Sequence, residues 1–598
     1  MKKLLVLIAF VFIFPLALTS CKGFGEVIYQ ISEDGNYAEV VGFMSLRSEV
    51  TIASEFLGKP VRKIGDCAFE DNYFLNTVTI PDSVTYIGDN AFSGCYNLES
   101  ITIPDRVTYI GDNAFGGCYG FESVIIPGSV TYIGESAFSM CEGLEFITIP
   151  HSVTHIGDDA FWGCESLTDI RVDENNKYYK SIDGNLYTKD GKELIKYAPG
   201  KKEPEFIIPS GVTSISSDAF PDCNYLTAIT VPDSMTIIED YAFYYCDRLE
   251  TITIPDSVIS ICDYAFYHCT GLTDIEIPES VTSIGSGAFR ECSGLVSIKI
   301  PDGVKNIELC TFSNCTSLTD IELPNNLATI GSYAFEKCSS LESIVIPNSV
   351  KNIETGAFFD CDGLTSIVIP DSVTSVGSGA FALSDKLEEI IVGENNECYK
   401  SIDGNLYTKD GRQLVEYACG KADVEFIFSD SVTSIASCAF RGCENLATIV
   451  IPDGWTSIDN DAFYCCYSLT NIIIPDSVTS IGQNAFYECD SLTSIVIPDG
   501  VTSIEYGTFY DCDNLRSVVI PDSVTRIGGS AFLSCDSLTS IVIPGSVTSI
   551  ADTAFAEHNS KFYGCVLNDI YYTGSEAEWD KIDKSYFYGA SVHYNYKG

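Results

Sequence analysis

PDSVTSIGQNAFYECDSLTSIVI, residues 475–497, is a 23-residue unit that recurs with small changes along most of this chain. A fixed period of this length is typical of a solenoid, in which each repeat forms one coil that packs on its two neighbours. The end of the unit alternates in the manner of a short strand, with Ile495 and Ile497 facing the core and Val496 facing solvent. The core positions expected in this unit are Val478, Ile481, Ala485, Phe486, Cys489, Leu492, Ile495 and Ile497.

Repeat prolines define the register of the coils. They recur every 23 residues from 81 to 150, from 209 to 370 and from 452 to 544. Two insertions of 36 residues interrupt this spacing, one after Pro150 and one after Pro370. We therefore predict a repeat solenoid over residues 61–557, mainly β, with a parallel sheet on one face and short helical turns.

The two insertions, near 171–205 and 391–425, are close copies of each other. They read NNKYYKSIDGNLYTKDGKELIKYAPGK at 175–201 and NNECYKSIDGNLYTKDGRQLVEYACGK at 395–421. Each contains two Asp-Gly pairs between alternating segments, a pattern that favours tight β-turns. We expect an antiparallel β-hairpin in each insertion, which either protrudes as a binding element or forms a structural variant of a coil.

The N-terminal stretch, MKKLLVLIAFVFIFPLALTSC, has two lysines followed by an apolar run, which is the pattern of a secretory signal. Its last four residues resemble a bacterial lipobox, in which the cysteine is acylated after cleavage. We predict a lipoprotein signal peptide at residues 1–20 and lipidation of Cys21, so that a lipid anchor alone holds the protein to a membrane. Ordinary signal cleavage near an unrelated cysteine is the alternative.

Both ends of the repeat array depart from the unit. Residues 21–60 do not match the repeat, and residues 558–598 carry Trp579 and many tyrosines. Terminal units of solenoids are atypical because they cover an open end of the core. We therefore assign an N-terminal cap to residues 21–60 and a C-terminal cap to residues 558–598.

The charge of the chain excludes one class of partner. The 598 residues include 34 Lys and Arg against 83 Asp and Glu, for a net charge of −49. Phosphate binding needs clustered Lys and Arg, so we expect no nucleic acid partner. The hydrophobic content of 45% is ordinary for a folded protein, and the acidity therefore belongs to the surface.

Most of the 25 cysteines occupy one repeat position, three residues after the repeat phenylalanine. A column of cysteines at one position behaves like a set of small buried hydrophobic residues, so free thiols are the first interpretation. Disulfides between adjacent coils are the alternative, since the coil spacing is within disulfide reach. The sixteen members are Cys95, Cys118, Cys141, Cys164, Cys223, Cys246, Cys269, Cys292, Cys315, Cys338, Cys361, Cys443, Cys466, Cys489, Cys512 and Cys535.

Catalytic and metal-binding motifs are not found in the sequence. The chain has five histidines, none of them in an HExxH motif, and it has no CxxC pair, Walker loop or GxSxG elbow. His151 and His155 have a spacing that would suggest a metal site on a helix, but they flank a turn after Pro150. We predict a non-enzymatic protein with no catalytic residue, no metal site and no cofactor.

The residue after the repeat proline position is acidic in twelve coils, and we name this column the acidic rail. Pro-Asp-Ser and Pro-Asp-Gly are favourable turns, which explains the column without a ligand. A divalent cation bound between stacked carboxylates is the alternative. The members are Asp82, Asp105, Asp233, Asp256, Glu279, Asp302, Asp371, Asp430, Asp453, Asp476, Asp499 and Asp522.

A second outward column lies two residues before the proline. It is mostly threonine in the early coils, then charged at Glu276, Lys299 and Glu322, and aliphatic afterwards. A long apolar column in water usually marks an interface, although solvent-facing valine also favours strands without any partner. We name the later part the aliphatic stripe and predict that it binds a partner. Its members are Val345, Val368, Ile427, Val450, Ile473, Val496, Val519 and Val542.

The unit IPDSVTSIGQNAFYECDSLTS resembles the BspA-type leucine-rich repeat, found in bacterial and protist surface proteins. Proline, Val-x-x-Ile, Ala-Phe-x-x-Cys and Leu-x-x-Ile-x-Ile recur at fixed offsets from about residue 60 to 557. The resemblance implies a leucine-rich-repeat solenoid that is right-handed with a parallel sheet on one face. It also implies adhesion, since characterised members bind host matrix proteins and other bacteria.

Together these observations predict an exported bacterial protein at the cell surface or outer membrane, anchored by lipid. We expect a monomer whose sheet face recognises an extracellular protein, such as a host matrix protein or a protein on another cell. A glycan-binding module and a structural spacer are the alternative functions.

Overall fold

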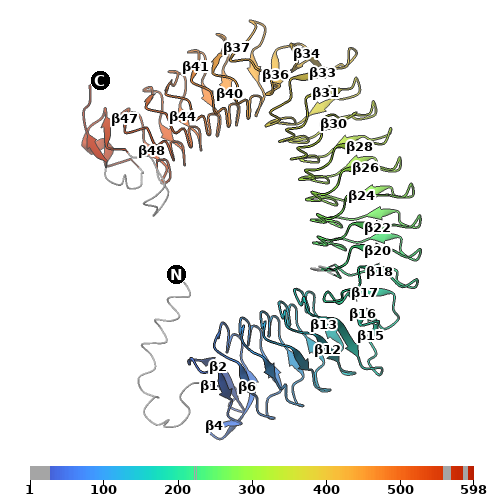
Figure 1. Cartoon of the computed structure of the whole chain (residues 1–598). Helices are drawn as coiled ribbons and strands as arrows, with labels where there is room; N and C mark the ends of the chain where they lie inside the picture. The colour runs from blue at the N-terminus through green and yellow to red at the C-terminus, as the bar shows by residue number, and fades with distance from the viewer. Residues whose placement is uncertain are drawn as a thin grey trace. The chain divides into compact units, whose positions relative to one another are not determined.

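Figure 1 shows the computed structural model of the chain, which describes residues 27–217, 219–220, 223, 225–555, 567–582 and 590–597. The repeats form a solenoid of parallel β-strands, as predicted from the sequence. Most coils contribute one strand to a sheet-face column and another, of two residues, to a second column. The chain divides into two compact units, residues 1–227 with 242–248 and residues 228–241 with 249–598.

In the first unit, residues before the repeats extend the second column. β1 pairs with β2 in antiparallel fashion, and β2 pairs in parallel with β5. The second column and its extension are β1 (Val27–Ile31), β2 (Ala38–Phe43), β5 (Lys59–Ile64), β7 (Tyr86–Ile87), β9 (Tyr109–Ile110), β11 (Tyr132–Ile133), β13 (His155–Ile156) and β19 (Ser214–Ile215), with β4 (Glu55–Phe56) paired to β5. The sheet-face column is β3 (Glu49–Thr51), β6 (Thr77–Thr79), β8 (Ser100–Ile101), β10 (Ser123–Ile125), β12 (Phe146–Ile149), β14 (Asp169–Val172) and β18 (Glu205–Ile207).

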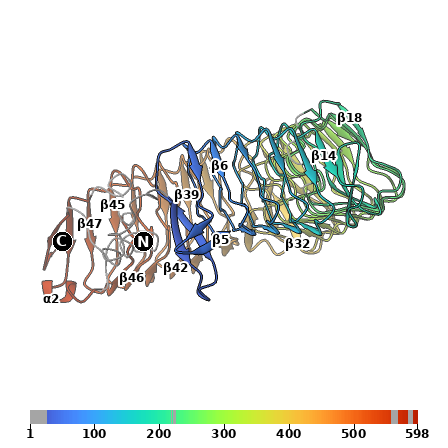
Figure 2. The ribbon, with the colours of Figure 1, turned by 90° about the horizontal axis from the view of Figure 1, so that it is seen from below.

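The second unit also has a sheet-face column and a second column. Figure 2 shows β45 and β46 on different sides of the ribbon. The sheet-face column is β20 (Ala228–Thr230), β22 (Thr251–Thr253), β24 (Asp274–Ile275), β26 (Ser297–Lys299), β28 (Asp320–Glu322), β31 (Ser366–Ile369), β33 (Glu389–Val392), β37 (Glu425–Ile427), β39 (Thr448–Val450), β41 (Asn471–Ile473), β43 (Ser494–Val496), β45 (Ser517–Val519), β47 (Ser540–Ile543), β49 (Asp569–Tyr572) and β50 (Ser591–His593). The second column is β21 (Ile237–Ile238), β23 (Ser260–Ile261), β25 (Ser283–Ile284), β27 (Asn306–Ile307), β29 (Thr329–Ile330), β30 (Asn352–Ile353), β32 (Ser375–Val376), β38 (Ser434–Ile435), β40 (Ser457–Ile458), β42 (Ser480–Ile481), β44 (Ser503–Ile504), β46 (Arg526–Ile527) and β48 (Ser549–Ile550).

Each insertion forms three antiparallel strands and then rejoins the solenoid. In the first insertion these are β15 (Tyr179–Ile182), β16 (Asn185–Thr188) and β17 (Glu193–Lys196); in the second they are β34 (Tyr399–Ile402), β35 (Asn405–Thr408) and β36 (Gln413–Glu416). The third strand pairs in parallel with the next repeat strand, β17 with β19 and β36 with β38. Each insertion is therefore an excursion within a variant coil.

Backbone hydrogen bonds join consecutive coils and also form the turns within them. The Phe92 N–H donates to the Ala114 carbonyl one coil further on, at 2.8 Å. Inside the coil, the Cys95 N–H donates to the Phe92 carbonyl, so the short helical turn expected there is a single three-residue turn. Among the described residues, one segment near the C-terminus is α-helical, α2 (Glu576–Trp579). No described helix has the length and apolar character needed to cross a membrane.

The core of each coil is formed by the repeat phenylalanine, cysteine, leucine and isoleucine. Phe486 is fully buried, and its ring stacks between those of Phe463 and Phe509 with ring centroids 5.4 and 5.5 Å away. In the insertions, Tyr197 and Tyr417 take the place of the phenylalanine and stack on the ring of the next coil. Because every coil repeats the same contacts, the core stacks from coil to coil, with one cluster over residues 38–198 and another over residues 407–582.

Candidate functional site

The aliphatic stripe lies on the outer surface of the sheet-face column in the second unit. Val345 is 84% exposed, Ile427 65% and Val496 64%. Neighbouring members are in register, since Val450 pairs with Ile427 on one side and with Ile473 on the other. The other members, which are exposed or half-buried, are Val368, Val450, Ile473, Val519 and Val542. The predicted side chains from Ile427 onward therefore form one apolar surface, and the second insertion separates Val345 and Val368 from this run. Partner binding there stays a prediction.

The structure extends the aliphatic stripe with residues that sequence analysis missed. Ile391 on β33, which is 37% exposed, has Val368 as its strand partner. At the other end, Val542 pairs with Tyr571, and Tyr571 pairs with His593. The Tyr571 ring stacks on the His593 ring with centroids 4.9 Å apart, so the apolar surface ends on aromatic side chains. The only signal in the sequence was the late Asp-Ile-Tyr-Tyr segment, in which the repeat is already degraded.

The acidic rail runs beside the aliphatic stripe. Asp499 follows Val496 by three residues, across Ile497 and Pro498, and both outer residues are exposed while both inner ones are buried. The same order holds for Asp522, and Asp453 and Asp476 are exposed as well, with Pro452 and Ile474 half-buried before them. Among the residues that the structure describes, no ion pair involves these four aspartates. The surface thus presents an apolar column and a parallel column of free carboxylates.

A further group of carboxylates crowds the turn that follows the cysteine column. The pKa of Asp490 is raised to about 6, first by burial and then by the negative charges of Asp513, Asp511 and Glu488. Burial and the neighbouring Asp513 likewise raise the pKa of Asp511. Like charges held at coil spacing therefore make the ionised form of Asp490 unfavourable in the folded protein.

We expect acidification from pH 7.5 to 5.0 to raise the melting temperature by up to about 1 °C, since solvent screening at this partly exposed carboxylate reduces the effect. Asp490 has a higher pKa in the folded protein than the value of about 3.9 in an unfolded chain, so the folded state binds more protons. Stability is therefore gained as the pH falls through about 6. Calorimetry at both pH values measures the effect. Asp490→Asn should reduce the rise, and a melting temperature that falls over this range would contradict the assignment.

The cysteine column is buried, and fifteen of its sixteen members are free thiols. The Cys118 thiol donates to the Phe92 carbonyl at 3.4 Å, and the same bond recurs along the column with Phe carbonyls 26 residues earlier. Burial raises the pKa of Cys95 to about 12, which makes the reactive thiolate scarce. The column is thus structural, in agreement with the first interpretation for all members but one.

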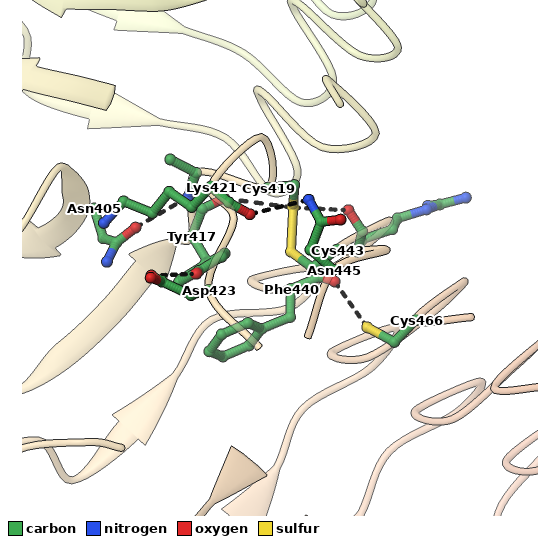
Figure 3. Close-up of a disulfide and its surroundings, with 11 residues drawn as sticks. Asn405, Tyr417, Cys419, Lys421, Asp423, Phe440, Cys443, Asn445 and Cys466 are labelled. Atoms are coloured by element: carbon green, nitrogen blue, oxygen red, sulfur yellow. Dashed lines mark hydrogen bonds between the residues drawn. A yellow bond between two sulfur atoms is a disulfide. The ribbon is translucent and has the colours of Figure 1, made fainter. Parts of the chain in front are cut away.

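The exception is Cys443, which forms a disulfide with Cys419 of the second insertion (Figure 3). The two Cα atoms are 4.5 Å apart, and the residues are 24 positions apart in the sequence. The first insertion has Pro199 where the second has Cys419, so the matching Cys223 stays a thiol. Free thiols were the wrong prediction for Cys443, because Tyr417 occupies the phenylalanine position of the variant coil and places Cys419 beside the column.

The two insertions bury opposite charges at matching positions, Lys196 in the first and Glu416 in the second. Burial raises the pKa of Glu416 well above its ordinary value, against the opposing effects of a hydrogen bond from the Phe381 backbone and of the positive charge of Arg441. The Arg441 guanidinium lies over the Tyr464 ring at 4.3 Å. Both side chains are buried and are therefore not available to a surface partner.

Tyrosines form ladders on the surface of the repeats. Tyr86, Tyr109 and Tyr132 stack with ring centroids 4.5 and 4.7 Å apart and nearly parallel planes. His155 continues this ladder at 4.6 Å from Tyr132. A sugar ring stacks on the face of an aromatic ring, and in a ladder the neighbouring rings already cover those faces. The ladders therefore offer a glycan mainly ring edges.

The structure also shows where the two closely spaced histidines of the sequence lie. His155 lies in the tyrosine ladder, whereas His151 Nδ1 lies 4.0 Å from an Asp173 carboxylate oxygen. Within the described ranges, no group of three or more His, Cys, Asp or Glu side chains is placed to hold a metal ion. Cys21, the predicted lipidation site, and the signal peptide at 1–20 lie outside the described residues.

The model of the BspA-type leucine-rich repeat region matches residues 62–186, 200–318, 291–408, 417–538 and 456–592 of the chain. A leucine-rich repeat protein of Eubacterium ventriosum is 29% identical, with 60% of this chain and 93% of that chain covered and a TM-score of 0.44. A leucine-rich cell surface protein of Faecalibacterium prausnitzii is 24% identical over 94% and 96% of the two chains, with a TM-score of 0.36. The pneumococcal vaccine antigen PcpA is 21% identical over 69% and 95%, with a TM-score of 0.35. No curated protein matches this chain.

Proposed function

Because this chain belongs to the BspA-type leucine-rich repeat proteins, we propose that it is a non-enzymatic adhesin that binds an extracellular protein through the aliphatic stripe. Repeat architecture suits this role, since a solenoid presents a long surface in which each coil adds one row of contacts. The partner is a protein of a host matrix or of another cell surface. The proposal includes export and a lipid anchor on Cys21, on the strength of the signal-like N-terminal stretch and the lipobox-like Leu18-Thr19-Ser20-Cys21.

The observation that carries the proposal is the exposed apolar surface of the second unit. Five consecutive sheet-face strands, β39 to β47, each present an aliphatic side chain at the same outward position. Interfaces commonly place such apolar residues at their centre, where water is excluded on binding. The corresponding position of the early coils carries the exposed threonines Thr79, Thr102, Thr230 and Thr253. Ile125 and Ile207 are also exposed at this position, each as a single aliphatic residue between polar ones. Strand propensity alone would not gather aliphatic residues into a run of neighbouring coils.

We expect the quadruple variant Val450→Thr, Ile473→Thr, Val496→Thr and Val519→Thr to bind its protein partner with at least tenfold lower affinity. Threonine keeps the β-branched shape but adds a hydroxyl, so the strand is retained while the apolar contact is weakened. Capture of purified matrix proteins by the immobilised protein measures the effect. The matched control is Thr79→Ser, Thr102→Ser, Thr230→Ser and Thr253→Ser, which should bind normally. Equal capture by the stripe variant and the unaltered protein would refute the proposed face.

The stacked tyrosines of the repeats weigh against glycan binding on the ladders, since the faces needed for sugar stacking are occupied by neighbouring rings. A spacer would need no run of exposed aliphatic residues on neighbouring coils. The adhesin proposal therefore accounts for a feature that the two alternatives leave unexplained.

A further inference from the structure

An ion pair in the second unit shows what a cation can reach from the sheet face. Lys299 on β26 occupies the outward position that is aliphatic in later coils, and its Nζ lies 2.7 Å from Oε1 of Glu279. Glu279 is a member of the acidic rail, one coil earlier. The hydrogen bond and charge of Lys299 lower the pKa of Glu279, and the same contact raises the pKa of Lys299. An ammonium group lying over this outward column is thus within hydrogen-bond distance of the rail.

The later coils keep the rail but have no such lysine. From β39 to β45 the outward position is Val450, Ile473, Val496 and Val519, while the rail carries Asp453, Asp476, Asp499 and Asp522. All four aspartates are exposed, and no described residue forms an ion pair with them. Where the coil of Lys299 supplies the cation of the pair, the later coils supply only the carboxylate. The missing cation is the complement of this surface.

We propose that the aliphatic stripe binds a cationic segment of the partner protein, in which apolar side chains lie on the stripe and Lys or Arg side chains pair with Asp453 to Asp522. This inference rests on the proposed function and assigns a chemical class to the partner. The pairs repeat the Lys299–Glu279 geometry between molecules. A second copy of this chain is a poor partner, since its net charge is −49 and like charges oppose contact.

Synthetic peptides test the chemistry directly. The probes are 12-residue peptides that repeat Val-Val-Lys-Lys, Val-Val-Glu-Glu or Ser-Ser-Lys-Lys, so that both residue types lie on each face of an extended chain, and each is titrated against the full-length protein by fluorescence anisotropy. We expect measurable binding for the Val-Lys peptide, roughly tenfold weaker binding for Ser-Lys and none for Val-Glu. Raising NaCl from 50 to 500 mM should weaken the Val-Lys complex, since exposed ion pairs are screened by salt.

Two variants with equal loss of charge separate the rail from the general acidity of the protein. The first is Asp453→Asn, Asp476→Asn, Asp499→Asn and Asp522→Asn, and the control is Asp82→Asn, Asp105→Asn, Asp233→Asn and Asp256→Asn, at the same turn position beside threonines. Asparagine preserves the turn, so both variants should fold. The first variant should bind the Val-Lys peptide about tenfold more weakly. Each of the four exposed ion pairs should contribute about two- to threefold in affinity, with partial additivity. The affinity of the control variant should change less than twofold.

Equal affinities of the two variants would overturn the inference, as would equal binding of the Val-Lys and Val-Glu peptides. The proposed function fails differently. If the stripe variant no longer captures the matrix protein while the variant with Asp453, Asp476, Asp499 and Asp522 changed to Asn still does, the adhesin face stands. The inference that the partner is cationic is then wrong. If the stripe variant still captures the matrix protein, the proposed binding face itself is wrong.

Discussion

Replacing Phe486 with alanine is expected to lower the free energy of unfolding by about 3–5 kcal/mol, the usual cost of removing a fully buried aromatic side chain. The ring is inaccessible to solvent and stacks on Phe463 and Phe509, so the cavity lies between three coils and no side chain at the edge can fill it. Guanidinium denaturation measures the loss. Val496→Thr in the same coil is the control, since its exposed side chain should change stability by at most about 0.5 kcal/mol.

Hydrogen exchange should also show where Phe486→Ala acts. A solenoid is stabilised by contacts between neighbouring coils, so protection should fall mainly in the coils that contain Phe463, Phe486 and Phe509. Protection near Phe92, in the first unit, should be unchanged. A uniform loss of protection along the whole chain, or no loss at all, would contradict a stack of nearest-neighbour contacts.

Reduction of the Cys419–Cys443 disulfide is expected to lower the free energy of unfolding by about 3 kcal/mol, because the bond closes a loop across 24 residues. Cys419→Ala should cause a similar loss without reductant, and it leaves Cys443 as a free thiol like the rest of its column. Chemical denaturation with and without dithiothreitol measures both effects. Cys398→Ala, a half-buried free thiol in the same insertion, is the matched control and should show little change.

The two treatments should not add, because they remove the same bond. If dithiothreitol destabilised the Cys419→Ala variant as much as the unaltered protein, another disulfide would have to be responsible. Unchanged stability of the unaltered protein under reduction would mean that the bond does not constrain the unfolded chain.

The repeating part of the fold could be predicted because each coil has the same pattern of apolar and polar residues. Phe486, Cys489 and Leu492 are buried as their spacing indicates, and Val496 is exposed. The 23-residue period also placed the aliphatic stripe in register, since a column on a parallel sheet needs only equal repeat lengths. Burial and register follow from periodicity; the partner of an exposed column does not.

The remaining features depend on departures from the period. Cys419 reaches Cys443 only because Tyr417 takes the place of a phenylalanine within an insertion, which equal spacing does not reveal. Lys299 and Glu279 are 20 residues apart, so their contact requires the path of the chain between two coils. Tyr571 follows a stretch where the repeat has decayed, and its register appears only through its pairing with Val542.

The most direct test of the proposed function is the affinity of a purified matrix protein for the unaltered chain and for the variant with Val450, Ile473, Val496 and Val519 changed to threonine, measured side by side. The account predicts at least a tenfold loss in the stripe variant, with unchanged thermal unfolding and with normal binding by the threonine-to-serine control. Equal affinities of the stripe variant and the unaltered chain would contradict the claim that this face binds the partner.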